Sequence, residues 1–195
     1  MNFSKFAIRK KFLLKRKRNF KNIKTFSFKK IFFLIKKNFN KKKLSIGCYF
    51  PSNFEVNILH FISESKNKNF EFGLPVIENG NKMNFRYWSE DEPLYLNKFG
   101  ITEPEFKNKI IKPDIILVPL VAFDRKLNRI GYGKGYFDRA LKELSKEKEI
   151  LTIGIAFSFQ ECSYIPFEKH DYKLDCILTD KKLIYNKENE NFIFR

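Results

Sequence analysis

The chain has 195 residues, of which 43% are hydrophobic and 17% are aromatic. These values place it among globular proteins, and its longest apolar runs are far too short to cross a membrane. We therefore expect residues 1–195 to form a single domain, with no membrane partner.

The net charge of +17 lies almost entirely in a basic arm, residues 1–43, which holds 17 Lys and Arg and no Asp or Glu. The remainder carries 39 − 17 = 22 basic residues against all 22 acidic ones and is neutral. The arm could be a solvated helix face, a nucleic-acid-binding arm, a targeting segment or part of an anion site. The dominant residues of the arm have A/T-rich codons, so the base composition of the genome could explain them. The charge is therefore weak evidence for a binding partner, and we expect no nucleic-acid partner.

Targeting and cysteine patterns point to the cell interior. Lysines interrupt the first forty residues too often for a signal peptide, and the arm lacks the Arg-rich and Ser-rich composition of a transit peptide. The chain has three cysteines, Cys48, Cys162 and Cys176, which is an odd number, and no two of them form a CxxC motif. We expect reduced structural thiols in a cytoplasmic protein.

The predicted elements alternate between helices and strands. Ser4 can cap a first helix that places Lys5 and Arg9 on one face. In chain order there follow a helix at about 26–37, a strand at 44–50, a helix at 55–65, strands at 70–78 and 84–88 joined by an Asn-Gly turn, a short helix near 103–108, a central strand at 114–119, a helix at about 135–146, and strands at 151–157, 174–179 and 182–185. This alternation predicts an α/β fold with three layers, a mostly parallel sheet flanked by helices.

The stretch RIGYGKGYFDRAL, residues 129–141, has glycine at every second position from 131 to 135. Glycine permits positive φ and close approach to the main chain, and the following helix would offer free N–H groups to an anion. Arg129 and Lys134 would add positive charge. A triphosphate would fit such a loop.

The same loop also has a purely structural interpretation. GYGKG is neither GxGxxG nor GxxxxGK[ST], so a tight turn between strand and helix could explain the glycines alone. Asp138 could simply stabilise the first turn of its helix. Pattern alone leaves the two interpretations evenly matched.

The wider order of residues decides between them. DIILVPLVAFDRKLNRIGYGKGYFDRAL resembles the 5-formyltetrahydrofolate cyclo-ligase family, whose members have an apolar strand, Phe-Asp, a polar turn, Arg and GxGxGYYDR. KFAIRKK, CYFPSNFEV, FRYWSEDEPL, FGITEPE and AFSFQECSYIPFEKHDYKLDCILTD continue the resemblance in order over nearly the whole chain. The combination is specific, although each motif alone is weak.

The resemblance implies an enzyme that converts 5-formyltetrahydrofolate to 5,10-methenyltetrahydrofolate, with ATP as co-substrate, Mg²⁺ as cofactor, and release of ADP and phosphate. The formyl oxygen would attack the γ-phosphate, so the protein would supply alignment and charge neutralisation, with no nucleophile of its own. We expect a monomer.

Site residues follow from matched positions in the family. The implied ATP-binding residues are Lys5, Arg9, Arg129, Ile130, Gly131, Tyr132, Gly133, Lys134, Gly135, Tyr136 and Phe137. The implied folate-binding residues are Phe50, Glu55, Tyr132, Gly133, Lys134, Gly135 and Tyr136. Lys134, Arg129 and Tyr136 would act in catalysis, and Asp138 and Asp175 would hold Mg²⁺, which prefers oxygen ligands.

The chain departs from the family at several positions. Phe137 stands where Tyr is usual, and Lys134 where Gly is common. Asn57-Ile58 replaces an acid-threonine pair, although Asn57 could still cap a helix. His170-Asp171 fits the family, and we favour a structural hydrogen bond there over catalysis.

Two other functions stay open on sequence grounds. An RNA-associated protein would bind RNA in a salt-sensitive way through the basic arm. A small-molecule kinase would also use a glycine loop but would release a stable phosphorylated product.

Overall fold

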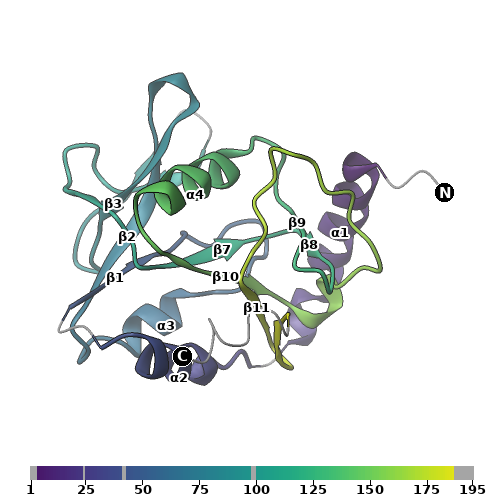
Figure 1. Ribbon diagram of the computed structural model, residues 1–195, viewed down its shortest axis with the longest axis horizontal. Helices are drawn as coiled ribbons and strands as arrows, with labels where there is room; N and C mark the ends of the chain where they lie inside the picture. The colour runs from purple at the N-terminus through teal and green to yellow at the C-terminus, as the bar shows by residue number, and fades with distance from the viewer. Residues whose placement is uncertain (1–3, 24, 41–42, 98–99, 187–195) are drawn as a thin grey trace.

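The structure is a computed structural model that describes residues 4–23, 25–40, 43–97 and 100–186 (Figure 1). Its central sheet contains β1 (Leu44–Gly47), β2 (Phe70–Ile77), β3 (Met83–Tyr87), β6 (Ile110–Ile111), β7 (Ile115–Pro119), β10 (Leu151–Ala156), β11 (Cys176–Thr179) and β12 (Leu183–Tyr185). Two small sheets pair β4 (Tyr95–Leu96) with β5 (Thr102–Glu103) and β8 (Ala122–Phe123) with β9 (Arg129–Ile130). The α-helices are α1 (Lys5–Asn19), α2 (Lys29–Asn38), α3 (Leu59–Ser63) and α4 (Tyr136–Glu147).

The eight strands are ordered β12-β11-β10-β7-β1-β2-β3-β6. The five from β11 to β2 run parallel, while β12, β3 and β6 add antiparallel edges. The chain passes from β1 to β2 on one side and places β7 on the other side of β1. The order therefore reverses at β1 and β7, the kind of point where open α/β sheets bind ligands beyond the carboxyl ends of their strands.

Helices cover both faces of the sheet, which confirms the predicted three-layer α/β fold (Figure 1). Alternate residues of β7 face opposite layers, as the period of a strand requires. Ile115 and Leu117 lie in a core that α2 and α3 cover. Ile116 and Val118 lie in a second core, which includes Leu141 of α4. Because both faces are covered, the sequence of β7 is continuously apolar.

The basic arm is packed into this domain. Ser4 caps α1 by accepting a hydrogen bond from the Ala7 N–H, as predicted. Ile8 and Phe12 of α1 are buried against the β8–β9 pair, and α2 is amphipathic, with its apolar face in the first core. Arg16 of the arm does not belong to a solvated helix face, because it is only 1% exposed.

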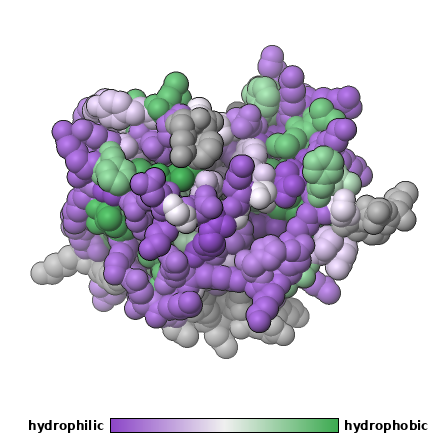
Figure 2. Space-filling view, turned by 90° about the horizontal axis from the view of Figure 1, so that it is seen from above, coloured by the Kyte–Doolittle hydropathy of each residue, from purple (hydrophilic) through white to green (hydrophobic). Residues whose placement is uncertain are grey.

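The face seen in Figure 2, from above the view of Figure 1, is largely hydrophilic, with apolar residues in small separate groups. Among residues 4–23, 25–40, 43–97 and 100–186, no helix is long and apolar enough to span a bilayer.

Two predicted helices differ from the structure. No helix forms at 103–108, because Pro104 favours an extended Glu103, which pairs in β5. The predicted helix at 55–65 is limited to α3, since the Leu59 N–H donates to the Asn57 side chain and starts the helix late. The residues before it form a turn instead.

Candidate functional site

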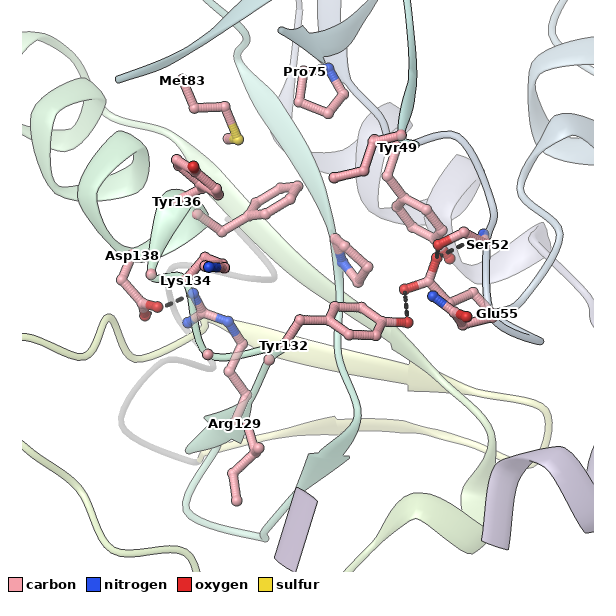
Figure 3. A pocket seen from close by; sticks show the side chains of 18 of the residues that line it. Tyr49, Ser52, Glu55, Pro75, Met83, Arg129, Tyr132, Lys134, Tyr136 and Asp138 are labelled. Carbon is pink, nitrogen blue, oxygen red and sulfur yellow. Dashed lines mark hydrogen bonds and ion pairs between the residues drawn. The ribbon is translucent and has the colours of Figure 1, made fainter. Parts of the chain in front are cut away.

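A cavity of about 440 Å³ opens at the carboxyl ends of β1, β2 and β7 (Figure 3). Phe50 follows β1, Ile77 ends β2 and Pro119 ends β7, and all three line the cavity. The volume suits a small-molecule site, and the cavity lies where the strand order reverses. The topology of the sheet therefore explains the location of the site.

The glycine loop, residues 131–135, forms one wall of the cavity between β9 and α4. Gly133 and Gly135 have φ of 97° and 65°, values that L side chains rarely adopt. A Cβ on Gly133 would also lie 3.2 Å from the Arg9 guanidinium carbon. Arg9 Nε donates to the Gly131 carbonyl at 2.8 Å. The glycine at 133 thus allows both the turn and the close approach of Arg9.

Helix α4 starts immediately after this loop, with Gly135 at its N-cap. The N–H groups of a first helical turn lack partners within the helix and favour an anion. Tyr136, Phe137 and Asp138 of that turn all line the cavity. The loop and helix end together form a suitable phosphate cradle.

Arg129, which is buried, forms an ion pair with the partly exposed Asp138 beside that cradle. Arg129 Nη2 donates to Asp138 Oδ1 at 2.7 Å, and Arg129 Nη1 donates to the Tyr172 carbonyl. Burial lowers the pKa of the Arg129 guanidinium, and the negative charge of Asp138 opposes that shift. Arg129 is therefore held by protein groups, and it fixes the start of α4 relative to the 172 segment.

Lys5 brings a second cation to the cavity from α1. Its Nζ donates to both carboxylate oxygens of Asp171, at 2.8 and 2.6 Å, and lies 3.2 Å from Glu168. The Glu168 N–H also donates to Asp171. His170 lines the cavity but is mostly exposed. Asp171, which also lines the cavity, therefore orients Lys5, and its structural rather than catalytic role stays a prediction.

The opposite wall carries Glu55 in a strained turn. Asn53 and Phe54 have φ of 46° and 61°, and the Ser52 N–H donates to Glu55 Oε2 at 2.9 Å. The Tyr132 hydroxyl donates to Glu55 Oε1 at 2.9 Å across the cavity (Figure 3). Burial raises the pKa of the Glu55 carboxyl, and the hydrogen bonds from Ser52 partly oppose this rise. Burial also raises the pKa of Tyr132 to about 12.

An apolar surface completes the cavity. Its apolar lining comes from Pro75 and Ile77 of β2, Met83 of β3, Phe50 and Tyr136. Figure 3 shows Met83 beside Tyr136, across the cavity from Glu55. A flat ring with polar edges would fit between such a surface and Glu55.

The structure brings together nearly all the residues that sequence reasoning selected. Those that line the cavity are Lys5, Arg9, Phe50, Glu55, Arg129, Ile130, Gly131, Tyr132, Gly133, Lys134, Gly135, Tyr136, Phe137 and Asp138. Trp88 is not among the residues that line the cavity; it is buried, and its indole N–H donates to the Glu92 carbonyl.

Asp175 is not brought to this cavity. It precedes β11 and accepts hydrogen bonds from the Thr152 N–H at 2.8 Å and the Thr152 hydroxyl at 2.6 Å, at the amino ends of the strands. This arrangement does not support the prediction that Asp138 and Asp175 hold one Mg²⁺ together. No cluster of three or more His, Cys, Asp or Glu suited to a metal occurs among the described residues.

Asp138 alone still fits a nucleotide-bound Mg²⁺. Both of its hydrogen bonds from described residues, those of Arg129 and the Tyr172 N–H, fall on Oδ1, and it lines the cavity beside the phosphate cradle. Mg²⁺ is commonly held by one or two carboxylates, water and substrate phosphates. A single carboxylate is therefore a sufficient protein contribution.

Sequence reasoning missed Arg16 and the apolar surface. Arg16 lies seven residues after Arg9, two helical turns along the same face of α1, and this spacing could have identified it. Pro75 and Met83 gave no such signal, because only the pairing of β2 with β3 brings them together.

Comparisons with known proteins identify the family of this chain. Residues 2–180 match the 5-formyltetrahydrofolate cyclo-ligase family. A 5-formyltetrahydrofolate cyclo-ligase of Haemophilus influenzae is 34% identical over 141 residues, 69% of this chain and 75% of the relative. The solved structure of Aquifex aeolicus 5,10-methenyltetrahydrofolate synthetase is 32% identical, with a TM-score of 0.73 over 94% of this chain and 93% of that one. A Mycoplasma pneumoniae 5,10-methenyltetrahydrofolate synthetase is 25% identical, with a TM-score of 0.64 over 92% and 99%. The chain belongs to the 5-formyltetrahydrofolate cyclo-ligase family.

Proposed function

We propose that this protein converts 5-formyltetrahydrofolate to 5,10-methenyltetrahydrofolate and hydrolyses ATP to ADP and phosphate in the same reaction. The observation that supports this most directly is one cavity that is lined by a phosphate cradle, by the carboxylate of Glu55 and by an apolar surface. The family membership agrees with it.

The reaction needs two substrates held in line. The formyl oxygen attacks the γ-phosphorus of ATP and ADP leaves. The second folate nitrogen then attacks the activated formyl carbon and loses its proton, and the former formyl oxygen departs within phosphate. Because the nucleophiles belong to the substrates, the protein contributes alignment and charge neutralisation.

The loop wall would bind the nucleotide. The free N–H groups at the start of α4 would contact phosphate, and Lys5, Arg9 and Lys134 would offset its charge. In this proposal Arg129 acts mainly by holding Asp138 and the helix end, since its guanidinium already donates to two protein groups. Asp138 would hold Mg²⁺, which neutralises phosphate charge when bound.

Glu55 and the apolar surface would bind the pterin ring. The Glu55 carboxylate is suited to accept hydrogen bonds from ring N–H groups, while Phe50, Tyr136 and Met83 offer apolar contact to its face. All these groups come from one chain, so the predicted monomer would be sufficient for activity.

A spectroscopic assay tests the proposal. Purified protein is mixed with Mg²⁺, ATP and 5-formyltetrahydrofolate, and the near-ultraviolet absorbance of the methenyl product is followed together with ADP release. We expect equal amounts of methenyl product and ADP, and neither without ATP. ADP release with a stable phosphorylated product would indicate a kinase instead, and no turnover at saturating ATP would remove the assignment.

A further inference from the structure

Arg16 is a buried cation with unusual surroundings. It is 1% exposed, Nη1 donates to the Leu120 carbonyl at 3.2 Å, and Nη2 donates to the Tyr132 hydroxyl. Its Nε has no hydrogen-bond partner among the described residues. Burying a guanidinium without a directly paired carboxylate is costly, so a compensating role is expected.

The compensating charge is the Glu55 carboxylate, which is linked to Arg16 through the Tyr132 hydroxyl. The Tyr132 hydroxyl accepts from Arg16 and donates its only proton to Glu55 Oε1. Because arginine does not lose its proton in proteins, Arg16 must donate to Tyr132, and an ionised Glu55 can only accept from the Tyr132 hydroxyl. The guanidinium carbon also lies 5.6 Å from the centre of the Tyr132 ring. Arg16, Tyr132 and Glu55 thus form one polarised chain from the core to the cavity.

We propose that Arg16 is a positioning residue that keeps Glu55 ionised and fixed towards the cavity, so that it can accept the N–H groups of the pterin ring. This inference rests on the proposed function for its ligand. Arg16 itself contacts no substrate.

The surroundings of Glu55 explain why a cation is needed. Burial raises the pKa of the Glu55 carboxyl, whereas Ser52, Arg16 and Tyr132 lower it. The other titratable groups facing it are Tyr49, whose hydroxyl donates to the Val56 carbonyl, and His60 of α3, which lines an adjoining cavity together with Glu55. Among these groups, Arg16 is the permanent cation.

Three variants separate charge from packing. Arg16→Gln keeps an amide donor but removes the charge, Arg16→Lys keeps the charge, and Arg18→Gln removes an exposed charge from the same helix as a control. The titration of Glu55 is followed by carboxyl carbon NMR, and the KM for 5-formyltetrahydrofolate is measured from pH 6 to pH 8.

We expect Arg16→Gln to raise the pKa of Glu55 and to raise the folate KM about tenfold at pH 6, with a smaller effect at pH 8, since one pKa unit corresponds to a tenfold change. The KM for ATP and kcat should change less than about threefold. Arg16→Lys should restore the wild-type profile, and Arg18→Gln should match wild type.

An unchanged Glu55 titration and folate KM profile in a folded Arg16→Gln variant would overturn the inference. If that variant does not fold, Tyr132→Phe breaks the same chain and must also raise the pKa of Glu55. A wild-type protein without cyclo-ligase turnover would remove the proposed function, whereas the Glu55 titration would still decide whether Arg16 controls its charge.

Discussion

The two ends of the parallel strands both hold carboxylates near the core, but they use them differently. At the amino ends, Asp175 accepts two hydrogen bonds from Thr152, and Asp114 accepts from Lys148 Nζ at 2.6 Å and the Ser45 N–H at 3.0 Å. At the carboxyl ends, Asp138 and Glu55 receive protein donors and also face a cavity of about 440 Å³.

This difference shows how to separate structural from functional acids in the sheet. The amino-end carboxylates accept their hydrogen bonds from neighbouring strands and from Lys148, which follows α4, and these contacts stabilise the sheet without a ligand. The carboxyl-end groups lie where loops diverge and where the sheet order reverses, so a ligand can complete their coordination. Substitutions at the carboxyl ends should therefore lower activity, whereas those at the amino ends should change stability and leave activity nearly unchanged.

The substitution Asp138→Asn should have the largest effect on activity. We expect kcat/KM to fall about 100-fold, as for loss of one important electrostatic group in a catalytic site. The free energy of unfolding should fall by about 2 kcal/mol, because Arg129 loses a charged hydrogen bond. Unfolding should remain cooperative. Activity is measured by methenyl formation and stability by urea denaturation.

The matched control is Asp175→Asn at the other end of the strands, assayed under the same conditions. Wild-type turnover of Asp138→Asn over a range of Mg²⁺ concentrations would show that this carboxylate does not hold the metal.

The second effect concerns the loop. Gly133→Ala should weaken ATP binding about tenfold and destabilise the fold by about 1 kcal/mol, because φ is 97° and the new Cβ would approach Arg9. Gly131→Ala is the control for stability, since a Cβ there has nothing within 4 Å. Nucleotide binding is measured by calorimetry. Equal stability of the two variants would contradict a strained position 133.

Much of this architecture could be predicted from local signals. The continuous apolar run of β7 and the glycine at the N-cap of α4 place these elements to within about one residue. The prediction of a helix at 103–108 was wrong because Pro104 favours an extended conformation for the residue before it. This proline is a local signal against a helix that the prediction did not use.

The site was predictable only in part, for two physical reasons. The glycine loop and its flanking residues are contiguous, so their motif survives in the sequence. By contrast, the burial of Arg16 depends on packing of α1 against distant segments, and the apolar surface depends on strand pairing. The sequence also held a signal against Asp175 as a metal ligand. A residue that precedes a parallel strand lies at the amino end of that strand, whereas ligands bind beyond the carboxyl ends.

The third prediction compares apolar residues at the two ends. Met83→Ala should raise the folate KM about fivefold through lost apolar contact, and should leave the KM for ATP unchanged. Ile150→Ala is the control, since Ile150 packs in the same core but precedes β10 at the amino end. Both variants should lower the melting temperature. A similar folate KM for the two would mean that Met83 does not contact folate.

The smallest effect on turnover is expected for Asp175→Asn, which should remain within about twofold of wild type because the side chain lies outside the cavity. The effect of Asp175→Asn should instead be on the pH dependence of stability.

Burial raises the pKa of the Asp175 carboxyl, although hydrogen bonds from Thr152 oppose this. A raised folded-state pKa means that the native protein binds more protons than the unfolded chain, so this group lowers stability as pH rises through that interval. Asparagine has no such titration, and its amide oxygen can still accept from Thr152. The free energy of unfolding of the variant, relative to wild type, should therefore increase from about pH 4 to about pH 7. A relative stability that decreases over this range in urea denaturation would show that Thr152 holds the carboxylate ionised and that burial is not the dominant influence.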